Sequence, residues 1–326
     1  MTVFRKSKTI IKKILDVLMR PVISGQQKNL LLCSDILVRQ NNSLKKINDL
    51  SDVEFSVFSQ WGEDGILSWI IDKLEVVPES FIEFGVENYT EANTRYLLSK
   101  RNWSGLVIDG SLRNISEIKA ANYFWRYDLQ AKQEFITAEN IDQIILDSGF
   151  NGEIGVLSID IDGNDYWVWK AISCVDPIIV IIEYNALLGD QKCISTPYDP
   201  AFVRGKKHFS HVYFGGSVRA MCDLAAEKGY TFIGTNSNGV NAFFVRSDCA
   251  QPVLDKMDAV VAYPSKLREA RNSRGALSFS RGIDRVSPIQ DCAFIDLSKS
   301  KSKTVSLRSL GDIYSKNWLA GKKSEL

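Results

Sequence analysis

The feature that most constrains the fold is a series of four short apolar runs separated by segments of helical character. The runs are Phe81–Gly85, Leu106–Gly110, Val156–Ile161 and Ile178–Ile182. Their apolar residues are continuous rather than alternating, which is typical of strands covered on both faces of a sheet. The helical stretches lie near residues 91–101, 111–121, 138–148 and 165–172. Strands that alternate with helices predict an α/β fold, built on a doubly wound, mostly parallel sheet.

The alternation of apolar runs and helical segments stops after the fourth run. Residues 186–214 form a long irregular segment. Two later runs, Tyr230–Gly234 and Asn241–Arg246, are close enough in sequence to pair as a hairpin. We therefore expect a parallel sheet closed by an antiparallel last strand. Residues 251–326 carry only a weak helical signal and are interpreted as a C-terminal extension.

The net charge of +1 hides an asymmetry along the chain. Residues 1–50 hold ten Lys+Arg and three Asp+Glu, whereas the remaining residues hold 30 and 36. This basic segment reads as two amphipathic helices separated by a break at Pro21–Gly25. It could pack on the body of the protein, on a second copy in a homo-oligomer, or on an anionic membrane surface. We divide the chain into this basic helical extension, a central α/β domain over residues 51–250, and the C-terminal extension.

Composition excludes several classes of protein. With 45% hydrophobic and 24% charged residues, the chain is of ordinary globular composition. It has no apolar run of the roughly 20 residues that a transmembrane helix needs. It also lacks the strongly basic domain of a nucleic-acid binder. Its six cysteines are scattered without metal-ligand spacing. We expect a cytoplasmic protein, with membrane association through the basic extension as an alternative.

Polar residues and one glycine gather where the predicted strands end. In a doubly wound sheet, ligands bind at the carboxyl ends of the strands. Carboxylates are rarely buried without partners, so this many at one edge exceeds what packing requires. The residues are Glu83, Gly85, Asp109, Asp160, Asp162, Glu183 and Asn185.

Asp109 suggests the kind of ligand. An acid that ends the second strand can accept both hydroxyls of an adenosine ribose. The turn after the first strand, Gly85–Asn88, has one glycine where a dinucleotide fingerprint has three, and Glu87 would repel a pyrophosphate. A cationic or zwitterionic adenosine ligand fits such an acid-lined turn better.

At this point the sequence resembles the class I S-adenosylmethionine-dependent methyltransferases, especially the FkbM-like branch, over about residues 56–248. The resemblance rests on Ser59–Gly65, Ile82–Asn88, Val107–Gly110, Leu157–Asp165 and Ile181–Asn185. It implies a seven-stranded sheet whose last strand is antiparallel, with S-adenosylmethionine as cofactor. The glycine-rich first motif of the family is degenerate here, and its Asp-x-Glu-Gly reads Asp160–Gly163.

The resemblance also implies roles for individual residues. Glu83 and Gly85 would line the methionine end of the cofactor, and Asp109 would hold the ribose. Gln60 and Glu63 look like the family's polar pair before the first strand. Further candidate cofactor contacts are Asn88, Asp128 and Asp160.

The segment Asp160–Asp165 looks like part of an EF-hand loop, but Ala171 stands where that loop ends in glutamate, so EF-hand calcium is rejected. Another all-oxygen site is open, since Mg²⁺ favours such ligands. Some sugar and catechol O-methyltransferases bind a divalent ion in similar places. The alternative is a metal-free site whose acids bind substrate hydroxyls. The candidate metal ligands are Asp160, Asp162, Glu183 and Asn185.

The chain has two histidines, His208 and His211, both in the long irregular segment. Transfer of a methyl group to a hydroxyl requires removal of its proton, and a histidine suits that task at neutral pH. We take both histidines as candidate bases, with Asp160 as a third candidate catalytic residue. A basic group just upstream, Arg204, Lys206 and Lys207, could bind an acidic or phosphorylated substrate or be a solvated charge run.

Three functions remain open. The first is an S-adenosylmethionine-dependent O-methyltransferase acting on a sugar or glycan hydroxyl in surface-polysaccharide or natural-product biosynthesis, with or without Mg²⁺. The second is a catalytically inactive scaffold or binding module of the same fold, docked to a membrane or a biosynthetic complex. The third is a metal-dependent hydrolase built on the Asp160–Asp162 pair, against which the lack of a histidine-rich ligand set argues.

Overall fold

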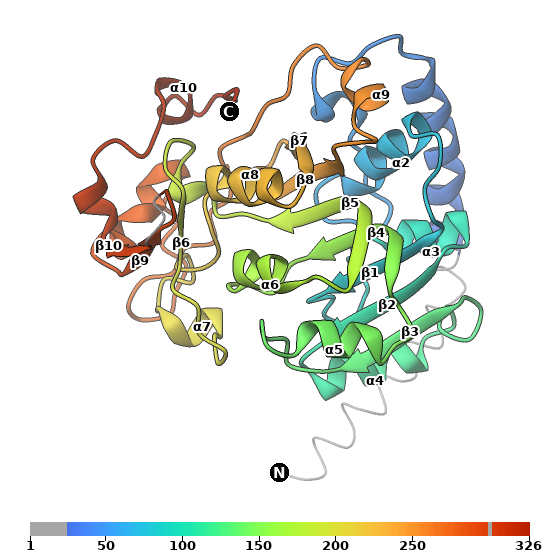
Figure 1. Cartoon of the computed structure of the whole chain (residues 1–326), viewed down its shortest axis with the longest axis horizontal. Coiled ribbons are helices and arrows are strands. Elements are labelled where there is room, and N and C mark those ends of the chain that lie inside the picture. Colours follow the sequence, from blue (N-terminus) through green and yellow to red (C-terminus); the bar gives the residue numbers. More distant parts are fainter. Residues whose placement is uncertain (1–24, 299–301) are drawn as a thin grey trace.

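The computed structural model describes residues 25–298 and 302–326. At its centre is a seven-stranded sheet with the strand order β3-β2-β1-β4-β5-β8-β7 (Figure 1). The strands are β1 (Ser80–Phe84), β2 (Ser104–Asp109), β3 (Leu129–Gln133), β4 (Gly152–Ile159), β5 (Val175–Glu183), β7 (Tyr230–Thr235) and β8 (Asn241–Arg246).

The directions of the strands confirm the predicted α/β class. Strands β1 to β5 are mutually parallel, and β8 is antiparallel to both of its neighbours, β5 and β7. The last strand of the sheet is therefore the antiparallel one, as predicted. The chain runs outward from β1 to β3 and then returns to β4 beside β1. This reversal creates a switch point at the carboxyl ends of β1 and β4, where a ligand crevice is expected.

Helices cover both faces of the sheet. One face carries α2 (Glu63–Lys73), α3 (Arg95–Arg101), α4 (Leu112–Ala120) and α9 (Gln251–Leu254). The other carries α5 (Ile141–Leu146), α6 (Asp165–Ala171) and α8 (Val218–Glu227). Strand β5 shows why its sequence is apolar throughout. Ile179 and Ile181 face the first set of helices, and Val180 and Ile182 face the second, because successive side chains point to opposite faces.

The C-terminal part of the chain builds a second, smaller layer beside the carboxyl ends of the strands. Strand β9 (Phe294–Asp296) pairs with β6 (Ile194–Ser195) and with β10 (Lys303–Val305) in a three-stranded antiparallel sheet. Four short helices complete the layer: η2 (Ala186–Leu188), η3 (Gly282–Ile289), η4 (Leu307–Leu310) and α10 (Lys316–Leu319). The two strands β9 and β10 were not expected in the C-terminal extension.

A helix over residues 25–43 packs against the outside of α2 and α3 (Figure 1). It is attached by polar contacts, including Tyr96 Oη to Ser34 Oγ at 3.0 Å and Lys100 to Asp35 at 2.6 Å. The apolar residues predicted to form its buried stripe are largely exposed, with Ile36 at 66%. The first predicted basic helix lies outside the described residues. Among the described helices, none combines the length and the apolar character needed to cross a membrane.

Candidate functional site

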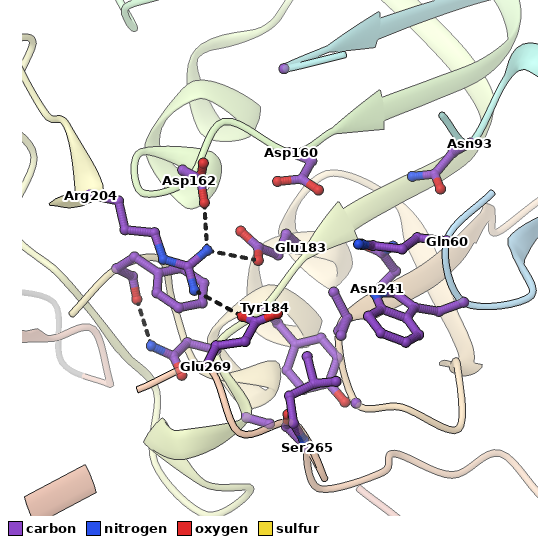
Figure 2. A pocket seen from close by; sticks show the side chains of 18 of the residues that line it. Gln60, Asn93, Asp160, Asp162, Glu183, Tyr184, Arg204, Asn241, Ser265 and Glu269 are labelled. Carbon is purple, nitrogen blue, oxygen red and sulfur yellow. Dashed lines mark hydrogen bonds and ion pairs between the residues drawn. The ribbon is translucent and has the colours of Figure 1, made fainter. Parts of the chain in front are cut away.

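A cavity of about 350 Å³ lies at the carboxyl ends of β1, β4 and β5 (Figure 2). We call it the carboxyl-edge cavity. Its walls on the sheet side are polar and come from the strand ends predicted above: Glu83, Gly85, Asp160, Asp162, Glu183 and Asn185. The opposite wall comes from the loop before α2 and from the C-terminal layer: Gln60, Trp61, Ser265, Leu267, Glu269 and Arg285. A ligand held here would touch segments far apart in the sequence.

Two further cavities adjoin it. One, of about 190 Å³, is lined by Asp109, Gly110 and Phe135, and we call it the Asp109 cavity. The other, of about 570 Å³, is lined by His211 and Arg271, and we call it the Arg271 cavity. Asp162 lines all three. The three cavities together follow the carboxyl edge of the sheet from β2 to β5.

Gly85 directly follows β1 and lies against the backbone of Asp160, which directly follows β4. Its φ of +73° lies in the left-handed region, and a Cβ there would lie 1.6 Å from the carbonyl oxygen of Asp160. Only glycine meets both conditions. The turn therefore leaves bare backbone facing both the carboxyl-edge cavity and the Asp109 cavity.

Glu83 is a buried carboxylate held by the loop before α3. Its Oε1 accepts from Asn93 N at 2.8 Å, and its Oε2 accepts from Thr94 N at 3.1 Å and from Thr94 Oγ1 at 2.5 Å. Burial raises the pKa of Glu83, and these donors partly oppose that rise. The side chain thus fixes the 93–94 loop against the cavity while lining it.

Asp109 ends β2 and binds the turn that leads into α4. Its Oδ1 accepts from Ser111 N at 2.7 Å and from Asn114 Nδ2 at 3.0 Å. No group in the described parts of the chain donates to its Oδ2. The carboxylate is therefore oriented by one oxygen and offers the other to the Asp109 cavity.

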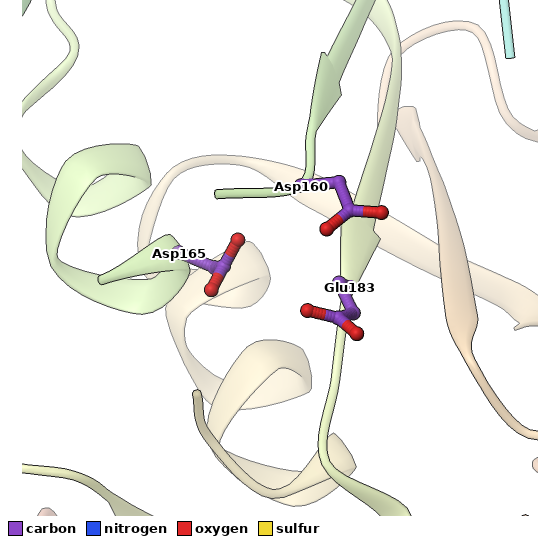
Figure 3. A group of neighbouring side chains, drawn as sticks. All are labelled: Asp160, Asp165 and Glu183. Carbon is purple, nitrogen blue, oxygen red and sulfur yellow. The ribbon is translucent and has the colours of Figure 1, made fainter. Parts of the chain in front are cut away.

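Three acidic side chains lie close together (Figure 3), and two of them, Asp160 and Glu183, line the carboxyl-edge cavity. Oxygens of Asp160, Asp165 and Glu183 lie within 4.8 Å of one another. Burial raises the pKa of Asp160, and repulsion from Asp162 and Asp165 adds to the rise. Burial also raises the pKa of Glu183, with repulsion from Asp160 as the next cause. Burial likewise raises the pKa of Asp165 to about 6, although Ile161 N and Gly163 N donate to its carboxylate. Glu183 Oε2 is buried without a hydrogen-bond partner in the described chain.

Arg204 supplies positive charge beside this cluster (Figure 2). Its Nη1 lies 2.5 Å from Asp162 Oδ1 and 3.8 Å from Glu183 Oε1, and its Nη2 lies 3.8 Å from Glu269 Oε2. The guanidinium stacks on Phe214, 3.7 Å from the ring centroid. Arg204 comes from α7 (Arg204–Lys207), in the basic group for which the sequence left a binding role and a solvated role open.

Asn185, a predicted metal ligand, uses its side-chain amide in hydrogen bonds to the backbone. Its Nδ2 donates to Val212 O at 2.9 Å and to Phe214 O at 3.0 Å, while its Oδ1 accepts from Leu187 N. The amide therefore holds the chain after β5 in place. Asp165, which the prediction left out of the metal set, lies in the cluster instead.

The predicted polar pair before β1 divides between two roles. Gln60 is exposed and lines the carboxyl-edge cavity. Glu63 is fully buried and does not line it. Its Oε1 accepts from Asn236 Nδ2 at 2.7 Å and Asn241 Nδ2 at 2.9 Å. Glu63 ties the loop between β7 and β8 to the start of α2, so it acts on the site through the position of other residues.

Two predicted cofactor contacts lie away from the cavities. Asp128 is exposed and precedes β3, at the amino end of a strand whose carboxyl end faces the site. The structure therefore does not bring Asp128 to the carboxyl edge of the sheet. Asn88 lies on the β1–α3 loop, but its Nδ2 donates to Glu117 Oε2 at 3.2 Å and it lines none of the three cavities.

The two histidines are placed differently. His208 does not line the carboxyl-edge cavity, and its Nδ1 accepts from Ser210 N at 3.2 Å. His211 lines the adjoining Arg271 cavity, with a left-handed backbone at φ +58° and its carbonyl oxygen bound to Arg204 Nε at 2.7 Å. Among the three candidate catalytic residues, Asp160 is the one that lines the carboxyl-edge cavity itself.

Several lining residues had no signal in the sequence. Asn93, Glu269 and Arg285 belong to segments without a recognisable motif, and the fold brings them to the cavity. Glu269 and Arg285 come from the C-terminal extension, which the sequence pattern did not connect to the site.

No family model matches this chain, and no curated protein matches it. Solved structures offer only distant likenesses. An S-adenosylmethionine-dependent methyltransferase from Clostridium acetobutylicum has 11% identity and a TM-score of 0.35, over 56% of this chain and 89% of that chain. An O-methyltransferase from Bacillus cereus in complex with SAH has 14% identity and a TM-score of 0.34, over 54% and 74%. The N-terminal domain of EvdMO1, in the presence of SAH and D-fucose, has 9% identity and a TM-score of 0.37. The match covers 65% of this chain and 94% of that chain. The strand order of the chain itself defines the fold.

Proposed function

We propose that this protein is an S-adenosylmethionine-dependent O-methyltransferase of the class its sequence resembles, acting on a hydroxyl of a sugar or glycan. The observation that carries the proposal is a pair of cavities along the carboxyl edge that share Gly85 and Asp160 in their walls. Asp109 lines one of these cavities, and Glu83 lines the other. Cavities lined by acids at a switch point suit an adenosine ligand that carries a positive charge. A surface-polysaccharide or natural-product pathway is the expected context.

The residues present fit this cofactor. Asp109 Oδ2 is free to accept from ribose hydroxyls, and the bare backbone at Gly85 allows close approach. When bound, S-adenosylmethionine supplies a methyl group on a sulfonium centre. The protein's own contribution is to hold the cofactor and the acceptor in line, which is the main source of rate in such a transfer. Asp160 lines the cavity and is the proposed acceptor of the hydroxyl proton.

A sugar acceptor is supported by the composition of the remaining wall. Carboxylate and amide groups face the cavity beside aromatic rings, including Asn93, Trp61 and Phe214. Hydroxyl groups of a sugar need hydrogen-bond partners when they leave water, and the faces of its ring pack on apolar surface. The carboxyl-edge cavity offers both kinds of contact.

A divalent cation fits part of the predicted ligand set. Asp160 and Glu183 would hold it, because both lie in the acidic cluster and Glu183 Oε2 is buried without a partner among the described residues. All-oxygen ligands are those that Mg²⁺ prefers. Such an ion would polarise the acceptor oxygen. Asn185 is committed to the chain after β5, and Asp162 is paired with Arg204.

The experiment that tests the proposal is a calorimetric titration of the full chain with S-adenosylhomocysteine. Stoichiometric binding that is weakened by Asp109→Asn supports it. Absence of binding would instead favour the second proposal, a catalytically inactive scaffold, for which the degenerate glycine motif and the Arg204 ion pairs in the cavity argue. In that case residues 1–50 would dock the protein to a membrane or a biosynthetic complex, and removal of this segment would release it in cell fractionation.

A further inference from the structure

We infer that the acceptor carries an anionic group, a carboxylate or a phosphate, and that Arg285 and Arg204 bind this group at the C-terminal-layer end of the carboxyl-edge cavity. The inference rests on the proposed function, because it names the chemical class of the acceptor in the same site.

Arg285 is the main reason. It lies on η3, lines the cavity and is only 4% exposed. Its Nε donates to Gly282 O at 3.1 Å and its Nη2 to Ser265 O at 3.4 Å, both neutral carbonyl groups. Within the described part of the chain, Arg285 forms no ion pair, and its Nη1 has no hydrogen-bond partner. A buried charge is costly unless it is paired. The missing partner is therefore an anion that arrives with a ligand.

A ligand anion would compete with the carboxylate of Glu269 for the two arginines. Its carboxylate faces Arg204 at 3.8 Å, which is too long for a hydrogen bond, and its side chain is 55% exposed. Burial lowers the pKa of Arg285 and nearby Glu269 opposes that effect, so the two charged groups are within electrostatic reach. Glu269 thus pairs only loosely with Arg204, and a ligand anion that bonds the guanidiniums directly would displace it.

The position of the two arginines also explains how an acidic cavity could accept an anion. Arg204 lies between the sheet-side carboxylates and the C-terminal layer, because it reaches Asp162 and Glu183 on one side and Glu269 on the other. Arg285 lies on η3, in the C-terminal layer. An anion bound there would be separated from Glu183 by a guanidinium. Arginine suits this task since its fork matches carboxylate and phosphate oxygens.

The test uses the full chain, with and without saturating S-adenosylhomocysteine, titrated calorimetrically with glucuronate, glucose 1-phosphate, inorganic phosphate and glucose. We expect the two anionic sugars to bind at least 10-fold more tightly than glucose. Arg285→Gln should weaken their binding by about 10-fold or more, whereas Arg285→Lys should retain part of it. Glu269→Gln should strengthen it several-fold. Arg281→Gln, which removes an exposed guanidinium next to the same segment, is the matched control and should change nothing. Thermal unfolding verifies that each variant is folded.

Opposite effects at Arg285 and Glu269 are the signature of an anion subsite, since a purely structural role of either residue would not produce them. Equal binding of glucose and the anionic sugars, or unchanged binding in a folded Arg285→Gln, would overturn the inference. Inorganic phosphate binding as tightly as glucose 1-phosphate would also overturn it, because the site would then recognise a free anion. If S-adenosylhomocysteine fails to bind while the preference for anionic sugars persists, the proposed function fails and the anion subsite stands.

Discussion

Gly85 and Asp160 meet backbone to backbone at the switch point of the sheet: a Cβ on Gly85 would lie 1.6 Å from the carbonyl oxygen of Asp160. This contact joins the ends of β1 and β4, two paired strands, and both residues line the carboxyl-edge cavity and the Asp109 cavity. The left-handed backbone of Gly85, at φ +73°, turns the chain away at the same point. The shape of the candidate site thus depends on one residue without a side chain.

Gly85→Ala is therefore expected to be severely destabilising, by about 3 kcal/mol or more, because the strained φ and the clash with rigid backbone add together. The matched control is Gly149→Ala. Gly149 has a similar φ of +81° but open space around its Cβ position, so only the strain of about 1 kcal/mol should appear. Urea unfolding of both variants measures the difference. Equal losses would show that the contact with Asp160 relaxes freely.

Asp109→Asn is expected to weaken the binding of S-adenosylhomocysteine about 10-fold to 100-fold, because a charged acceptor of two hydroxyl groups becomes a neutral amide. Stability should change little, since an amide oxygen can still accept from Ser111 N and Asn114 Nδ2. Calorimetric titration gives the affinity. Asp128→Asn, at the other end of the sheet, should bind like the parent protein. A similar loss in both variants would remove Asp109 from the cofactor site.

Asp64, at the start of α2, should make stability depend on pH. Its Oδ2 accepts from Val57 N, Phe58 N and Ser59 N, but its Oδ1 is buried without a partner in the described chain. Burial raises its pKa from 3.8 to about 7, and the neighbouring Glu63 adds to the rise. Between these two values the folded state holds a proton that the unfolded state has lost. The stabilisation from Asp64 is thus complete below pH 4 and is lost as the pH rises to 7.

Asp64→Asn should abolish this trend, because its oxygen can still accept from the three backbone groups without carrying a charge. The free energy of unfolding of the variant, relative to that of the parent protein, should rise by up to about 4 kcal/mol between pH 4 and pH 7. Asp147→Asn, at an exposed position, serves as the control and should leave the shape of the pH curve unchanged. A constant difference between Asp64→Asn and the parent across this range would contradict the account.

Glu183→Gln is expected to abolish Mn²⁺ binding, because it removes the charge of the buried carboxylate whose Oε2 lacks a partner in the described chain. Asn185→Ala should keep the affinity for Mn²⁺ but lower the free energy of unfolding by about 2 kcal/mol, since three buried hydrogen bonds are lost. Electron paramagnetic resonance of free Mn²⁺ measures both affinities. Loss of Mn²⁺ binding in a folded Asn185→Ala would support Asn185 as a metal ligand.

The sequence predicted those strands whose residues are buried on both faces. Strand β5 is the clearest case, because its run of apolar residues from Ile178 to Ile182 can only be covered from two sides. Strand β3, by contrast, reads Leu-Gln-Ala-Lys-Gln and forms an edge of the sheet, with two exposed side chains. An edge strand has one neighbour and a solvated face, so its sequence carries no continuous apolar signal.

The candidate site was predictable where it depends on strand ends and unpredictable where it depends on tertiary contacts. Glu83, Asp160 and Glu183 lie at or just beyond the carboxyl ends of their strands, so the topology brings them to one edge. Nothing in the local sequence shows that the side-chain amide of Asn185 donates hydrogen bonds to backbone carbonyl groups. Nor does it show that Arg285, over a hundred residues after β5, returns to the same cavity.

Binding of S-adenosylhomocysteine to the full chain, measured by isothermal titration calorimetry, tests the central claim most directly. The account predicts one molecule bound per chain, with a loss of affinity in Asp109→Asn and no loss in Asp128→Asn. No detectable binding to the folded protein, or binding that is insensitive to Asp109, would contradict it.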